Sequence, residues 1–85
     1  MAASDRVYVS RFSSEDEDTA RRLVNALQVV GLDPQLTAPD APAGRWAVEA
    51  PAELEPTPDN LAELEAVMRA VARRSGATYE GREAL

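Results

Sequence analysis

An α+β fold with the element order β-α-β-β-α-β is predicted for this 85-residue chain. Three observations predict it: β-branched or alternating segments of strand length, two stripes of apolar residues at helical spacing, and the prolines and glycines that separate these segments. A chain of this length is typical of one small domain, so we expect a single domain over residues 1–85.

The first strand is expected at Arg6–Phe12, which is rich in β-branched and aromatic residues and stops at two serines. Ser13 or Ser14 is expected to cap a helix, with an acid three residues later to complete a capping box. Gly31 is expected to end that helix in the left-handed conformation. The helix would bury the apolar stripe Ala20, Leu23, Leu27 and Val30.

The middle of the chain predicts a hairpin followed by a loop. Asp33–Ala38 alternates weakly between prolines and is expected to be an edge strand. Pro39–Gly44 has the composition of a turn, and Arg45–Ala50 alternates as a return strand would. Pro51–Pro58 is acidic and rich in proline, so an irregular loop is expected there.

A second helix and a last strand complete the pattern. Thr57 before Pro58 is a favourable N-cap with proline at the first helical position, and Gly76 is expected to end the helix. Ala77–Leu85 can supply a short final strand. The apolar stripe of this helix consists of Leu61, Leu64, Met68 and Val71.

This element order is that of the split βαβ, or ferredoxin-like, fold. Right-handed crossovers place the first and third strands in the centre of a four-stranded antiparallel sheet and both helices on one face. The other face is then open to a partner. Which side of the first strand the helices cover is left undecided, because both sides carry apolar residues.

The composition excludes several kinds of chemistry. Nine arginines against fifteen acids give a net charge of −6, and the chain has no lysine, histidine or cysteine. Zinc sites of the usual kind, Ser-His-Asp and Cys-His relays, disulfides and lysine Schiff bases all need these residue types. We therefore expect a binding protein without enzymatic activity, cofactor or metal.

The acidic balance also bears on partners and location. Nucleic acids and anionic membranes attract clustered positive charge, so neither is an expected partner. The first five residues lack the apolar run of a signal peptide, and no stretch of eighteen apolar residues occurs. A cytoplasmic location is expected.

Two alternatives are compatible with the predicted fold. The segment Val7–Phe12 looks like the first strand of an RNA recognition motif, but the third strand offers only Trp46, in phase with Val48 and so expected to face the helices. The other alternative is a dimeric module that senses small molecules, like the ACT domains, which share this element order. A homodimer through the sheet edge or the helices is left open.

The C-terminal motif Tyr79-Glu80-Gly81, after a capped acidic helix, a Trp-x-Val strand and a Leu/Met-striped helix, resembles the RraB family. The resemblance covers about residues 7–83, with Arg82 where the family has tryptophan. It implies a cytoplasmic bacterial regulator that docks on an endoribonuclease of the ribonuclease E type and inhibits it without chemistry of its own.

A set of residues is therefore predicted to contact a protein partner on the basis of residue type and assumed topology. Aromatic residues and arginine are enriched at such contacts, and acids supply long-range attraction. The predicted contact residues are Tyr8, Phe12, Trp46, Tyr79 and Arg82, with Glu15, Asp16 and Glu17 as an electrostatic fringe.

Overall fold

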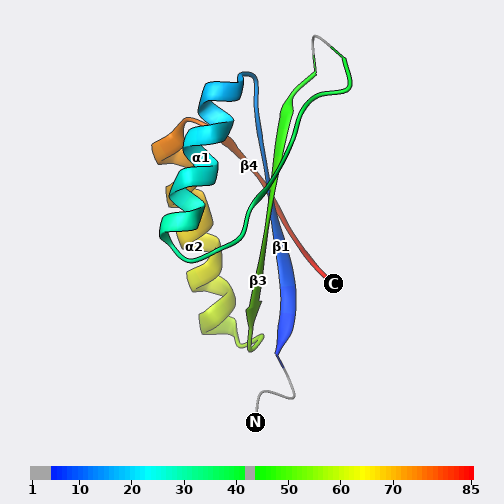
Figure 1. The fold of residues 1–85 in the computed structure, drawn as a ribbon. Coiled ribbons are helices and arrows are strands. Elements are labelled where there is room, and N and C mark those ends of the chain that lie inside the picture. Colours follow the sequence, from blue (N-terminus) through cyan, green and yellow to red (C-terminus); the bar gives the residue numbers. More distant parts are fainter. Residues whose placement is uncertain (1–4, 42–43) are drawn as a thin grey trace.

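The computed structural model describes residues 5–41 and 44–85 and has the predicted element order (Figure 1). The elements are β1 (Arg6–Ser14), α1 (Glu17–Val29), β2 (Gln35–Thr37), β3 (Trp46–Leu54), α2 (Pro58–Ser75) and β4 (Thr78–Ala84). The strands form one antiparallel sheet in the order β2-β3-β1-β4. The ferredoxin-like prediction is confirmed, including the central position of the first and third strands.

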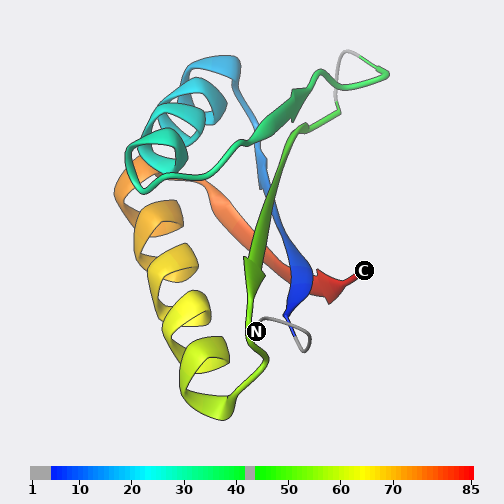
Figure 2. The same cartoon turned by 60° about the horizontal axis from the view of Figure 1, so that its bottom comes forward.

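Both helices lie on the same side of the sheet, as the two views show (Figures 1 and 2). The core lies between the helices and the sheet. Its largest fully buried apolar side chains are Phe12, Leu23, Leu27, Met68 and Val48. The opposite face of the sheet is not covered by any described element of the chain.

The pairing of β1 with β3 decides which side of β1 faces the helices. Phe12 lies opposite Val48, and Tyr8 lies opposite Ala52, on the buried side of the sheet. Phe12 is only 2% exposed. Val7 and Val9 therefore point to the open face, which resolves the question that the sequence left undecided.

The start of α1 differs from the sequence prediction. β1 continues through Ser14, and the N-cap of α1 is Asp16, whose carboxylate accepts from the backbone N–H of Thr19 at 2.9 Å. Ser13 and Ser14 are not caps, because pairing with β3 keeps both residues in the sheet. Asp is as good a cap as Ser, so the tertiary pairing decided between them.

The predicted loop at Pro51–Pro58 is also corrected. β3 continues to Leu54, and Pro51 lies opposite Val9 inside the strand. The short β2 pairs with β3 only as far as Glu49, so that beyond this residue β3 is itself an edge strand. Proline is tolerated at a strand edge, where its missing N–H breaks no ladder. The irregular segment is only 55–57.

The limits of α2 are those predicted. The Thr57 hydroxyl accepts from the backbone N–H of Asn60 at 3.1 Å, Pro58 follows as the first helical residue, and Gly76 ends the helix at a φ of 82°. α2 has 18 residues, whereas α1 has 13. This difference in length matters for the surface, because α1 stops while α2 continues along the sheet (Figure 2).

Other boundaries shift by a few residues. The edge strand predicted at Asp33–Ala38 is the shorter β2. Val30, predicted to belong to the buried stripe, is the C-cap residue of α1 and is 48% exposed. Residues 42–43 of the turn predicted at 39–44 lie outside the described residues. So do residues 1–4, which belong to the segment where no signal peptide is expected.

Candidate functional site

The open face of the sheet carries valines and charged side chains but none of the aromatic residues of the chain. All four aromatic residues lie on the side of the helices: Tyr8, Phe12, Trp46 and Tyr79. The open face is centred on Arg11, which is 2.6 Å from Glu83 and 3.4 Å from Glu49. RNA recognition by base stacking needs exposed aromatic rings on this face, so the structure does not favour that alternative.

Tyr8 and Phe12 are therefore not contact residues on this surface. Phe12 is in the core, and Tyr8 is buried in phase with it. Trp46 lies in phase with Val48, as expected, and packs half-buried against the core. The prediction that Tyr8 and Phe12 contact a partner is corrected, because the register turns both side chains toward the helices.

Tyr79 and Arg82 are brought together by a residue that the sequence prediction did not single out. Glu65 of α2 accepts from the Tyr79 hydroxyl at 2.8 Å and from the Arg82 guanidinium at 2.7 Å, both on the same carboxylate oxygen. Its other oxygen accepts from Arg69 at 2.8 Å. The spacing of Glu65 and Arg69, four residues apart on a helix, was a usable signal for this pair.

A bulge in β4 makes this arrangement possible. The pairing of β1 with β4 shifts register between Arg11 and Phe12, where Gly81 has a φ of 108°. The extra residue lets Tyr79 and Arg82, three positions apart, both reach the side of the helices. Strict alternation would place them on opposite faces.

The electrostatics of this cluster are set by the shared carboxylate. The hydrogen bond from Tyr79 lowers the pKa of Glu65 below its usual 4.5, and Arg69 and Arg82 lower it further. Burial raises the pKa of Tyr79 above 10.0, and the Glu65 carboxylate raises it further. The guanidinium of Arg69 also lies 5.3 Å from the centre of the Tyr79 ring. The hydrogen bonds and ion pairs around Glu65 thus stabilise the contact between α2 and β4.

The predicted acidic fringe has local roles at the start of α1. The hydrogen bonds from Thr19 to the Asp16 carboxylate, first of all the one from its backbone N–H, lower the pKa of that acid. Glu17 pairs with Arg21 one turn later, at 2.6 Å. Glu15 is exposed and lies 3.6 Å from Arg45. These acids are already engaged within the chain.

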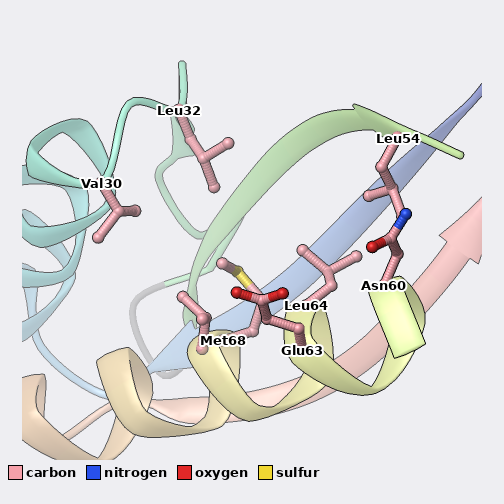
Figure 3. Close-up of a pocket in the computed structure, with 8 residues that line it drawn as sticks. Val30, Leu32, Leu54, Asn60, Glu63, Leu64 and Met68 are labelled. Atoms are coloured by element: carbon pink, nitrogen blue, oxygen red, sulfur yellow. The ribbon is translucent and has the colours of Figure 1, made fainter.

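An apolar groove lies at the other end of α1, lined by residues of α2, β3 and the segment that begins at the C-cap of α1 (Figure 3). Its volume is about 260 Å³. Val30 and Leu32 form one side, α2 forms the other, and Leu54 lies at one end (Figure 3). The full lining is Val30, Leu32, Leu54, Asn60, Glu63, Leu64, Val67 and Met68.

The groove exists because α1 ends early. After Val29 the chain turns at Gly31 and leaves the helix layer, while the first half of α2 continues over the sheet without a neighbouring helix. The side chains of α2 that a longer α1 would cover therefore remain accessible. Val29 is 86% exposed beside the groove residue Val30. Two consecutive valines before a helix-ending glycine were the only sequence signal of this site.

The chemistry that this groove offers is apolar contact. Its only polar side chains are Asn60 and Glu63, both at the surface of α2. Within residues 5–41 and 44–85, no group of three or more acids is arranged to hold a metal ion. Neither helix in that part of the chain has the length and apolar character needed to cross a membrane.

Comparison with known protein families finds no family model that matches this chain, and a search of curated proteins finds no match.

Proposed function

We propose that this chain is a non-catalytic protein-binding domain that regulates a partner by occupying its surface. The observation that carries the proposal is the apolar groove between the end of α1 and the first half of α2. Clusters of accessible apolar side chains rimmed by polar residues mark sites of protein association. The groove is also the part of the surface where Val29 and Val30 remain exposed.

The shape and lining of the groove favour a protein partner over a small molecule. Sites for small molecules usually enclose most of the ligand and present several converging polar groups. This groove is open to solvent and offers one amide, Asn60, and one carboxylate, Glu63. Such a site suits apolar side chains that protrude from another protein. It gives less support to the ACT-like alternative.

The finer form of the proposal comes from the resemblance to the RraB family. The motif Tyr79-Glu80-Gly81 supports an inhibitor of a bacterial endoribonuclease of the ribonuclease E type, acting in the cytoplasm. Arg82 occupies the position of the family's tryptophan and is engaged with Glu65. The groove supports protein binding in general, whereas the identity of the partner depends on the motif.

Site-specific photocrosslinking in the native host tests the proposal. A benzophenone amino acid is placed at position 63, at the groove, and in a control strain at the exposed position 40, far along the chain from it. We expect position 63 to yield one discrete crosslinked protein that position 40 does not yield. The purified partner should bind the chain, and its activity should change on binding.

Two results would count against the proposal at different levels. If position 63 captures nothing specific while a small molecule produces a large thermal shift and dimerisation, the chain is a sensor and the proposal fails. If the captured protein is not a ribonuclease, or its cleavage of RNA is unaffected by the chain, only the RraB-based form fails.

A further inference from the structure

We propose that the groove binds a basic amphipathic segment of the partner, in which apolar side chains are flanked by arginine or lysine. This inference rests on the proposed function and specifies the chemistry of the partner. The groove supplies the apolar contacts, and the charges around it determine which segments are attracted. The two contributions come from different residues and can be tested separately.

The charge of the molecule is distributed unevenly around the groove. The segments that line or adjoin it, residues 30–33 and 54–64, carry four acids and no arginine. The nearest arginine along the sheet is Arg6, opposite Leu54. The four acids are Asp33, Glu55, Asp59 and Glu63.

None of these four acids has an arginine partner. All nine arginines lie in the described part of the chain, and none is within 4.0 Å of any of the four carboxylates. Glu17, Glu49, Glu65 and Glu83, by contrast, each form an ion pair. No arginine therefore neutralises the negative charge near the groove, which is available to a partner.

The placement of the arginines explains this asymmetry. Three of them, Arg69, Arg73 and Arg74, lie in the second half of α2, where cations suit the helix dipole. The first half of the same helix, which borders the groove, carries Asp59 and Glu63 instead. Helix polarity thus concentrates negative charge at the end of α2 that α1 leaves uncovered.

Other occupants fit this surface less well. Nucleic acids and anionic lipids would be repelled by the unpaired acids. In a symmetric dimer through the groove, each copy would present the same patch, so Glu63 and Asp59 of one copy would approach the acids of the other. A basic segment satisfies both the apolar lining and the charge, and such complementarity mainly raises the association rate and fixes the choice of partner.

Selection from a random peptide library displayed on phage, with the full chain as the target, tests the proposal. We expect the enriched peptides to combine two or more large apolar residues with arginine or lysine. A labelled enriched peptide is then titrated by fluorescence anisotropy at low and high salt. Its affinity should fall with increasing salt, since surface charges are screened.

Variants at the rim locate the binding site. Glu63→Arg reverses an exposed charge at the groove, and Val30→Asp places a charge on the half-exposed apolar rim. Each should weaken peptide binding on the order of tenfold, equivalent to ~1.4 kcal/mol. Asp40→Arg makes the same change in charge at an exposed position outside the groove and should alter the affinity less than about twofold, in line with the small effect of an exposed charge. Circular dichroism confirms that the variants are folded.

The proposal is overturned if no peptide is enriched, if the enriched peptides lack basic residues, or if Glu63→Arg and Asp40→Arg bind them equally well. It is also overturned if ultracentrifugation shows a dimer that Val30→Asp dissociates, because the occupant is then a second copy. If these tests fail while crosslinking at position 63 still captures a functional partner, the proposed function stands and only the chemistry of the partner is wrong.

Discussion

Replacement of Tyr79 by phenylalanine removes one hydroxyl and retains the ring between Phe12 and Arg69. The hydroxyl donates to Glu65 at 2.8 Å. A hydrogen bond to a charged group contributes about 1.5–3 kcal/mol to stability. The Glu65 side chain is 30% exposed and keeps two arginine partners, so we expect a loss somewhat below this range, about 1 kcal/mol.

The loss should depend on pH in a defined way. Since the pKa of Glu65 is lowered in the folded state, its contribution is fully present above its usual 4.5 and disappears as the pH falls through the folded value. Since the pKa of Tyr79 is raised, its contribution is present below 10.0 and disappears as the pH rises through the folded value. The difference between Tyr79→Phe and the wild type should therefore be largest between these limits.

Urea unfolding followed by far-ultraviolet circular dichroism at a series of pH values measures this difference. With a urea dependence of about 1 kcal/mol/M, the midpoint at neutral pH should fall by about 1 M. Glu65→Gln provides the background for a double-mutant cycle, because it removes the titrating carboxylate. In that background the loss caused by Tyr79→Phe should no longer diminish at acid pH. An effect of equal size at all pH values would show that the hydroxyl does not interact with the carboxylate.

Substitutions at three further positions test the packing and the cap of α2, each by urea unfolding at neutral pH. Ser10→Ala removes a fully buried hydroxyl that has no hydrogen-bond partner among residues 5–41 and 44–85. The change should leave stability unchanged or raise it by up to about 1 kcal/mol, and a clear loss would show that the hydroxyl has a partner. Leu23→Ala creates a cavity under α1 and should cost about 2–5 kcal/mol, and a cost under 1 kcal/mol would contradict the core position of this residue. Thr57→Ala should cost about 1 kcal/mol whereas Thr57→Ser should retain most of the stability, because only the hydroxyl caps α2; equal losses would argue against that role.

The candidate sites show which contacts could be predicted from local sequence patterns and which could not. Tyr79 and Arg82 were predicted as neighbours in a motif, but their partner Glu65 lies on α2, and the bulge at Gly81 brings both to it. The fringe acids were predicted as a partner signal, whereas Asp16 acts as a helix cap. In each case the missing information was a contact between segments distant in the chain.

The groove was not predicted because it results from the difference in length between α1 and α2. The apolar stripe of the first helix ended with Val30, and nothing in the local pattern indicated that this residue would be half exposed. Only the packed helices show that α1 ends while α2 continues along the sheet (Figure 2).

The sequence by itself determined the element order, the helix limits at Thr57 and Gly76, and the absence of lysine, histidine and cysteine. These properties depend on residues that are close together in the chain, through caps, turn geometry and periodicity. The tertiary structure alone decided which face of β1 is buried, which acids pair with arginines of other elements and where apolar side chains remain open. Register and helix packing set these properties, since a shift of one residue would exchange the two faces of a strand. Part of the net charge of −6 thus acquires a location: four acids without an arginine partner lie in the segments that line or adjoin the groove.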